Sequence, residues 1–245
     1  NTLLIPNEEA LSKSNLLKLA RKALSTVVFQ TNDAKAAYPE NISLKGTVIF
    51  NPINDRLPES YSGEREKNIT TFCRISHEKN LTLLADAFAL FSKEFSDYRL
   101  KIIGDAINSS EKEVLSLLKE HIGILGITDK VDFIAFTPEV HSLIIRDMMY
   151  VNSSDHEGMS NAMLEAMAIG MPVICTDCPI GGANAIIESG ENGILTEVGN
   201  ADELCEAMKK IAGDVEFRNK LSHNASHVRN NLALENIARK WMELL

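Results

Sequence analysis

The sequence predicts an α/β protein built on a Rossmann-like, doubly wound parallel sheet. From residue 68 onward, short apolar runs alternate with segments in which apolar residues recur at helical spacing. The apolar runs, such as 131–134 and 148–151, are almost continuous, which is typical of strands buried on both faces. Strand–helix–strand units have right-handed crossovers, so we expect helices on both sides of the sheet and ligands at the carboxyl ends of its strands.

The individual elements follow from this alternation. The expected strands are 69–74, 98–103, 131–134, 148–151, 172–175 and 193–196. The expected helices are 80–95, 110–122, 139–145, 161–169, 183–188, 202–212 and 215–229. Ser109 or Ser110 is expected to cap the second of these helices, because a serine oxygen accepts hydrogen bonds from first-turn amides.

The first 55 residues have a different pattern and predict a second, incomplete unit. They contain an expected helix at 12–24, a strand at 27–29, a small helix around Ala34 and a strand at 47–50. This is too little for a core of its own, so residues 1–55 are predicted to be the remnant of another α/β domain. Residues 60–67 are predicted to form a polar linker, and the main domain is predicted at 56–232. A last helix at 233–245 is expected to cross back to the incomplete domain.

Composition excludes some functions. The net charge of −9 argues against sequence-independent binding of nucleic acid or anionic membranes. Cys175 and Cys178 form a lone C-x-x-C, read as a strand cysteine followed by a loop cysteine, with a redox or zinc role left open. The sequence has few cysteines and no long apolar run, and its N-x-S/T sites include Asn68 and Asn152, which adjoin expected strands where a glycan would not be tolerated. These features predict a cytoplasmic protein.

Two glutamates near a predicted helix start carry the first chemical signal. Glu157 and Glu165 are separated by seven residues, and the amides of Gly158 to Asn161 lie between them. Free amides and the helix dipole favour an anion such as a diphosphate at this position. On spacing alone, capping by both carboxylates is the simpler interpretation. Arg74 and Lys79 flank a second loop that follows a strand and precedes a helix.

The surrounding residues resemble a known family. The run from Asn152 to Asp177, with E-x7-E at its centre, resembles the corresponding region of retaining GT-B glycosyltransferases of family 4. Further matches are Arg74 to Asn80, Ile103-Gly-Asp105, Phe133 to Pro138, and Glu191-Asn-Gly-Ile-Leu. The resemblance covers about residues 26 to 245. Departures are Cys73 in place of a glycine, Met159-Ser160-Asn161 in place of an aromatic–glycine pair, and a variant loop at 179–184.

The resemblance implies a role for each matching residue. Arg74 and Lys79 would neutralise the diphosphate leaving group, Glu157 would contact the donor sugar, and Glu165 would accept hydrogen bonds from the ribose. The remaining donor-binding residues it implies are Gly158, Met159, Ser160 and Asn161 at the phosphates, Gly104 and Asp105 at a strand end, and Phe136, Thr137 and Pro138 around the base. His77 and His156 lie near the site as positional residues. No metal or other cofactor is expected.

The implied reaction is transfer of a hexose from a nucleoside diphosphate sugar, with UDP expected, to an acceptor with retention of configuration. The acceptor, a sugar or lipid-linked sugar, would bind to the missing N-terminal domain, so the chain is expected to be inactive alone. That domain could also bring the protein to a membrane surface. Two alternatives stay open, a non-catalytic sugar-nucleotide-binding module and a GT-B sugar-nucleotide epimerase. A dinucleotide-dependent oxidoreductase is not favoured, because no G-x-G-x-x-G follows a strand.

Overall fold

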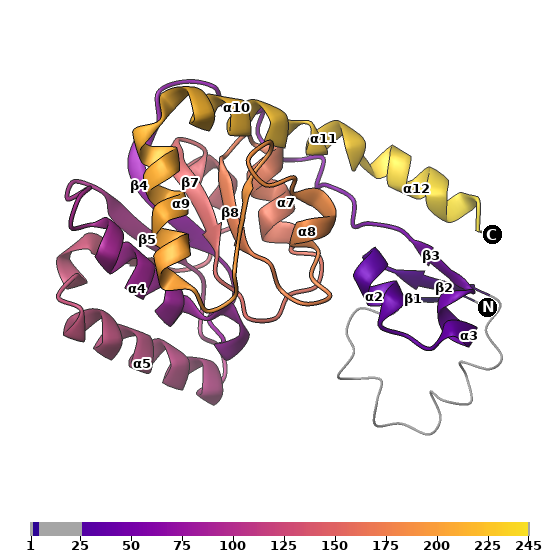
Figure 1. Cartoon of the computed structure of the whole chain (residues 1–245), viewed down its shortest axis with the longest axis horizontal. Helices are drawn as coiled ribbons and strands as arrows, with labels where there is room; N and C mark the ends of the chain where they lie inside the picture. Colours follow the sequence, from indigo (N-terminus) through magenta and orange to yellow (C-terminus); the bar gives the residue numbers. More distant parts are fainter. Residues whose placement is uncertain (1, 5–25, 245) are drawn as a thin grey trace.

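The computed structural model describes residues 2–4 and 26–244, which form two unequal parts (Figure 1). The larger part contains a parallel sheet of six strands in the order β6-β5-β4-β7-β8-β9. The smaller part contains a three-stranded parallel sheet in the order β1-β2-β3. The helix expected at 12–24 lies outside the described residues.

The larger sheet confirms the doubly wound prediction. Its strands are β4 (Glu66–Phe72), β5 (Arg99–Ile103), β6 (Val131–Ile134), β7 (Asp147–Asn152), β8 (Val173–Thr176) and β9 (Ile194–Thr196). The chain runs outward from β4 to β6, then returns to pair β7 with the other side of β4. Strand order therefore reverses between β4 and β7, and in open α/β sheets the carboxyl ends at such a point form a ligand crevice.

Helices cover both faces of this sheet. They are α4 (Leu81–Phe91), α5 (Ser109–Ile124), α6 (Val140–Ile144), α7 (Asn161–Ala168), α8 (Ala183–Ile186), α9 (Ala201–Gly213), α10 (Val215–Ser226) and α11 (Val228–Asn231), with short 3-10 turns η1 (His77–Lys79) and η2 (Thr128–Lys130). One apolar core joins α4, α5 and α9 to the sheet, and a second joins α6 and α7 to its other face. Helix α7, which carries Glu165, is thus held against the core along its apolar side.

Most element ends differ from the sequence prediction by a few residues, and α4, for example, ends at Phe91 and not at residue 95. Asn108, and not Ser109 or Ser110, caps α5, because it forms a capping box in which Glu111 accepts from the Asn108 amide. The helix expected at 215–229 divides at His227 into α10 and α11. Strand β4 begins at Glu66, inside the stretch expected to be a linker.

The smaller part has a core of its own, although a small one. Its elements are β1 (Thr2–Leu4), β2 (Thr26–Phe29), α2 (Asn32–Ala36), α3 (Glu40–Ser43) and β3 (Gly46–Val48), of which β1 and α3 were not expected. Val27, Phe29 and Ile42 are buried together there. The boundaries 1–55, 56–232 and 233–245 stay a prediction.

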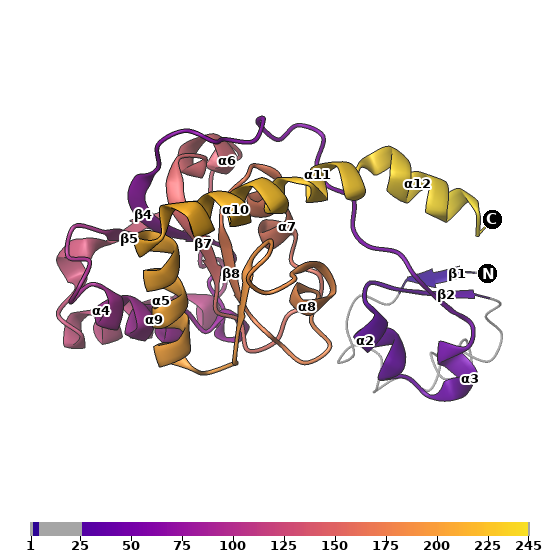
Figure 2. The ribbon, with the colours of Figure 1, turned by 45° about the horizontal axis from the view of Figure 1, so that its top comes forward.

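The last helix, α12 (Leu234–Met242), runs on from α11 toward the smaller part (Figure 2). Its buried Ile237 belongs to the same apolar cluster as Ile49 and Ile53, and the Ile53 amide donates to the Leu232 carbonyl over 2.9 Å. Trp241 packs against this cluster. The segment that leads out of β3 therefore packs near the start of α12, where Ile237 is buried, while Leu234 and Met242 stay exposed.

Arg65 and Arg229 form hydrogen bonds that hold the segment between β3 and β4 against the end of α7. Arg65 donates to the carbonyls of Tyr61 and Asp147 over 3.0 Å each and also to the carbonyl of Gly170. Arg229 donates to the Pro58 carbonyl and, over 3.3 Å, to that of Ala168. Burial lowers the pKa of Arg65 to about 10, and the guanidinium stays charged at neutral pH.

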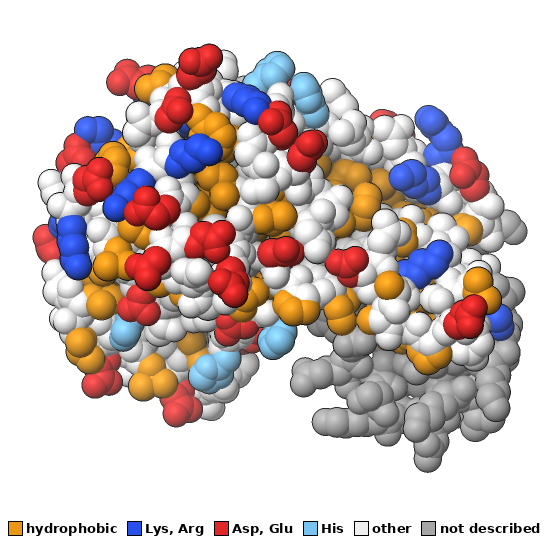
Figure 3. Space-filling view, viewed as in Figure 1, with side chains coloured by type: hydrophobic (Ala, Val, Ile, Leu, Met, Phe, Trp, Pro, Cys, Tyr) orange, Lys and Arg blue, Asp and Glu red, His pale blue; other side chains and the backbone are white. Residues whose placement is uncertain are grey.

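The surface carries mixed charge. Figure 3 shows acidic side chains spread over one face of the larger part with Lys and Arg between them, consistent with the net charge of −9. Among the described helices, none has the length and apolar character needed to cross a bilayer.

Candidate active site

A pocket of about 340 Å³ opens where strand order reverses. Its walls are the carboxyl ends of β4 and β7, the loop after β4, and the start of α7. It is lined by Thr71, Phe72, Cys73, Arg74, Lys79, Tyr150, Asn152, Ser153, Glu157, Met159, Ser160, Asn161 and Ala162. The structure therefore brings the predicted Arg74, Lys79 and Glu157 to one pocket.

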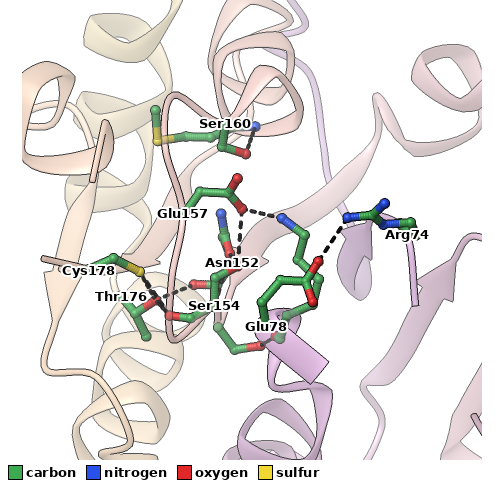
Figure 4. A network of polar contacts seen from close by, with 11 residues as sticks. Arg74, Glu78, Asn152, Ser154, Glu157, Ser160, Thr176 and Cys178 are labelled. Atoms are coloured by element: carbon green, nitrogen blue, oxygen red, sulfur yellow. Dashed lines mark hydrogen bonds and ion pairs between the residues drawn. The ribbon is translucent and has the colours of Figure 1, made fainter. Parts of the chain in front are cut away.

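Lys79 and Glu157 form an ion pair inside this pocket (Figure 4). Their side chains are only 17% and 20% exposed. The Ser153 hydroxyl donates to the Lys79 carbonyl over 2.9 Å, and the Ser154 hydroxyl lies 3.2 Å from the Glu157 carboxylate. The backbone of Lys79 and the carboxylate of Glu157 are thus each held by a serine that follows β7.

Arg74 lies at the open side of the pocket and is 62% exposed. Its guanidinium contacts the carboxylates of Glu78 at 2.9 Å and Glu111 at 3.8 Å. Burial alone would raise the pKa of Glu78, but backbone hydrogen bonds and the Arg74 guanidinium lower it below its usual value. An incoming anion therefore meets a cation already paired with carboxylates and must compete with them.

The loop before α7 is packed closely. Ser160 is the N-cap of α7, and its hydroxyl accepts from the Met163 amide over 3.3 Å. The Gly182 amide donates to the Gly158 carbonyl over 2.8 Å, and a Cβ on Gly182 would lie 2.7 Å from the Met159 Cα. The serine side chain therefore satisfies one first-turn amide itself, which leaves the preceding amides of α7 for a ligand.

Glu165 does not line the pocket. Its carboxylate accepts a hydrogen bond from His141 Nε2 over 2.9 Å, and the two side chains are 24% and 14% exposed. Glu165 lies on α7 and His141 on α6. The expected ribose contact stays a prediction.

The predicted Met159, Ser160 and Asn161 line the pocket, whereas Gly158 and the predicted residues at 104–105 and 136–138 do not. A Cβ on Gly104 would lie 1.9 Å from the Cys73 carbonyl oxygen, so only glycine fits between β4 and β5 here. The Asp105 carboxylate accepts from the Phe136 amide over 3.2 Å, and the Phe136 ring is 63% exposed. Thr137 accepts from the Val140 amide at the start of α6, with Pro138 between them. Their assignment to the nucleotide base stays a prediction.

The histidines and cysteines that the sequence singled out make no catalytic arrangement. His77 and His156 are exposed. Cys175 lies in β8 and Cys178 in the following loop, both buried and unbonded to each other, and the Cys178 thiol donates to the Ser154 carbonyl over 2.9 Å. Within residues 2–4 and 26–244, no three His, Cys, Asp or Glu side chains are grouped to hold a metal ion.

Sequence reasoning missed the inner wall of the pocket and one polar partner. Thr71, Phe72, Tyr150 and Asn152 line the pocket from the last residues of β4 and β7. The rule that ligands bind at strand ends could have indicated them. No local signal marks His141, because its contact with Glu165 joins residues 24 positions apart on two helices.

Comparison with known structures identifies the type of fold. The fold is similar to that of HepE from Anabaena in complex with UDP and glucose, with a TM-score of 0.86 and 22% identity over 99% of this chain and 70% of that one. The chain therefore has the GT-B glycosyltransferase type of α/β fold. The sequence model of the family described as glycosyl transferases group 1 matches residues 55–228, and the chain belongs to this family.

Two glycosyltransferases are similar in sequence to most of this chain. An uncharacterized glycosyltransferase of Haemophilus influenzae is 27% identical over 229 residues, or 93% of this chain. The N-acetylgalactosamine-N,N'-diacetylbacillosaminyl-diphospho-undecaprenol 4-alpha-N-acetylgalactosaminyltransferase of Campylobacter jejuni is 27% identical over 181 residues, or 74% of this chain. The chain spans 63% and 47% of the length of these two relatives.

Proposed function

We propose that this chain is the donor-binding part of a retaining glycosyltransferase of family 4 that transfers a hexose from a UDP-sugar. The observation that carries the proposal is the meeting of Arg74, Lys79, Glu157 and the start of α7 at one pocket. Two cations and a helix N-terminus suit a diphosphate, and a carboxylate beside them suits sugar hydroxyls.

The reaction we propose depends on stabilising the leaving group. Lys79 lies deep in the pocket and would give a point charge to the diphosphate, and Arg74 at the rim would bind it through two N–H groups. The charge that develops on the leaving UDP is met by these groups, so the proposed transfer needs no metal ion. When the donor binds, the ion pair would break. The Lys79 ammonium would then contact the diphosphate, and the Glu157 carboxylate would be free to contact the sugar.

The remaining donor contacts belong to the same proposal. Glu165 would bind the ribose hydroxyls, and Asp105 with Phe136 to Pro138 would lie beside the base. UDP is the favoured nucleotide because the Anabaena fold neighbours are complexes with UDP, UDP-glucose, and UDP with glucose. Galactose or an N-acetylhexosamine is the proposed sugar.

The acceptor site lies, in this proposal, in a part of the protein beyond this chain. Up to residue 50, the described residues 2–4 and 26–50 supply a small sheet and two short helices of the second part. We therefore expect no sugar transfer by the chain alone. We propose that the whole protein acts in the cytoplasm, in polysaccharide synthesis, on an acceptor such as a lipid-linked sugar. Transfer by the purified chain to a lipid-linked or free sugar would contradict this division.

A thermal-shift screen tests the proposed ligand class. The chain is heated with UDP, GDP, ADP, UMP and the corresponding sugar nucleotides, each with EDTA. A ligand at 100 times its Kd adds about 2.7 kcal/mol to the free energy of unfolding, so UDP and one or more UDP-sugars should raise the Tm clearly. If no nucleoside diphosphate raises it, the proposed function is wrong.

A further inference from the structure

His141 and Glu165 form an isolated pair beside the pocket. The imidazole Nε2 lies 2.9 Å from one carboxylate oxygen, Oε2. Within the described part of the chain, this is the one hydrogen bond found for the Glu165 carboxylate, which can accept about four. The other oxygen, Oε1, is therefore available to a ligand.

The imidazole is itself held by the sheet. Its ring meets the edge of the Phe72 ring, with centroids 5.8 Å apart and planes at 86°. Phe72 packs in turn on the fully buried Tyr150, with centroids 5.1 Å apart. Aromatic pairs in such tilted arrangements have a preferred geometry, so the imidazole direction is fixed by the two central strands, β4 and β7.

A glutamate on a helix surface samples several rotamers, and each ordered side chain costs conformational entropy. Glu165 gains from His141 one fixed contact before any ligand arrives. The line Tyr150–Phe72–His141–Glu165 thus connects the pocket wall to a carboxylate at its edge. Preorganisation of this kind raises affinity by reducing what the ligand must order.

We propose that His141 is a positioning residue: it holds Oε2 of Glu165 so that Oε1 faces the ribose hydroxyls of the donor nucleotide. This inference rests on the proposed function, in which Glu165 binds the ribose. His141 does not touch the nucleotide in this account. Its effect appears only with ligands that carry the ribose hydroxyls.

The test compares UDP with 2′,3′-dideoxy-UDP, which lacks both ribose hydroxyls, by calorimetry on the full chain. His141→Phe keeps an aromatic ring against Phe72 and removes the N–H, whereas His141→Gln keeps a donor. His121→Phe is the matched control, because His121 makes a similar pair with Asp86, at 2.6 Å, between α5 and α4 and does not line the pocket. Unchanged thermal melting confirms that each variant is folded.

We expect His141→Phe to weaken UDP roughly 2- to 13-fold, the range for one ordinary hydrogen bond, and to leave dideoxy-UDP unchanged. His141→Gln should recover part of the loss, and His121→Phe should lose nothing. Equal weakening of both nucleotides by His141→Phe and His141→Gln, or no weakening of either, would overturn the positioning role. Wild-type chain that binds UDP and dideoxy-UDP equally would instead remove the ribose role of Glu165, and with it this inference.

Discussion

Lys79 at the end of η1 and Glu157 before α7 satisfy each other's charge inside the pocket, with side chains only 17% and 20% exposed. The pair joins the loop after β4 to the loop after β7 across the point where strand order reverses. In the proposed function, a donor would have to insert between these two groups or share them. Stability and binding are coupled at this one contact.

The pair makes a prediction for stability. Lys79→Met or Glu157→Gln alone leaves a partly buried charge without its partner, so each should lower the free energy of unfolding by about 1 to 3 kcal/mol. The double variant should lose clearly less than the sum of the two single losses. Urea denaturation measures the free energy of unfolding of the wild-type chain, the two single variants and the double variant. Strict additivity would show that the contact contributes nothing to the fold.

The two glutamates should differ in ligand dependence. Glu165→Gln should weaken UDP about 10- to 150-fold, the cost of removing a charged hydrogen-bond partner. Glu157→Gln should not weaken UDP, because it removes only the carboxylate that pairs with Lys79, and it should abolish any preference for the UDP-sugar over UDP. Calorimetry with both ligands separates the roles. If both substitutions weaken UDP equally, the assignment is wrong.

We predict that no residue larger than glycine is tolerated at position 104. An added Cβ would lie 1.9 Å from the Cys73 carbonyl oxygen, which belongs to backbone and cannot turn away. Gly104→Ala should therefore cost about 3 kcal/mol or more, an overpacking cost at its upper end. Urea denaturation measures this loss in the free energy of unfolding.

Gly123 is the control for this substitution, because it lies inside α5 and nothing lies within 4 Å of its added Cβ. Gly123→Ala should be neutral or stabilising by about 0.5 to 1 kcal/mol, since alanine loses less backbone entropy in a helix. A Gly104→Ala protein as stable as Gly123→Ala would contradict the close approach of β4 and β5.

Cys73 gives a prediction that depends on pH. Burial raises the pKa of this pocket-lining thiol to about 11, against a smaller opposite effect of Lys79. A thiol with that pKa is thiolate in on the order of one molecule in a thousand at pH 8, and the thiolate is the reactive form. Alkylation of Cys73 by iodoacetamide should therefore be slow at pH 8 and rise about tenfold per pH unit up to pH 10.

Mass spectrometry of the Cys73 peptide follows this reaction, with circular dichroism confirming the fold at each pH. Saturating UDP should slow it further, because the nucleotide would cover the pocket. Modification at pH 7 as fast as that of N-acetylcysteine would show that the pKa of this half-buried thiol is not raised.

The sequence predicted the larger sheet well because its strands are buried on both faces and read as continuous apolar runs. Val131–Ile134 was predicted with its observed ends, and α7 to within one residue. The cap of α5 was wrong because Asn108, Ser109 and Ser110 are all good caps. What decides is Glu111, which stands three residues after Asn108 and closes the capping box.

From the sequence, only those site residues could be predicted that stand shortly after the end of a strand. Arg74, Lys79 and Glu157 stand in loops at strand ends, so their meeting follows from the topology. The pairing of Lys79 with Glu157, of Arg74 with Glu78, and of His141 with Glu165 depends on how the loops and helices pack. Such contacts leave no periodic signal in the sequence.

Calorimetry of UDP binding in EDTA by the wild-type chain, Lys79→Met and Lys67→Met tests the proposed donor site most directly. Lys67 is the matched control, because it pairs with Asp97 on the surface, with side chains 57% and 58% exposed, at the opposite end of β4. We predict metal-free binding of UDP that Lys79→Met weakens roughly 10- to 150-fold and Lys67→Met leaves unchanged. Binding that requires magnesium, or equal affinity in all three proteins, would contradict it.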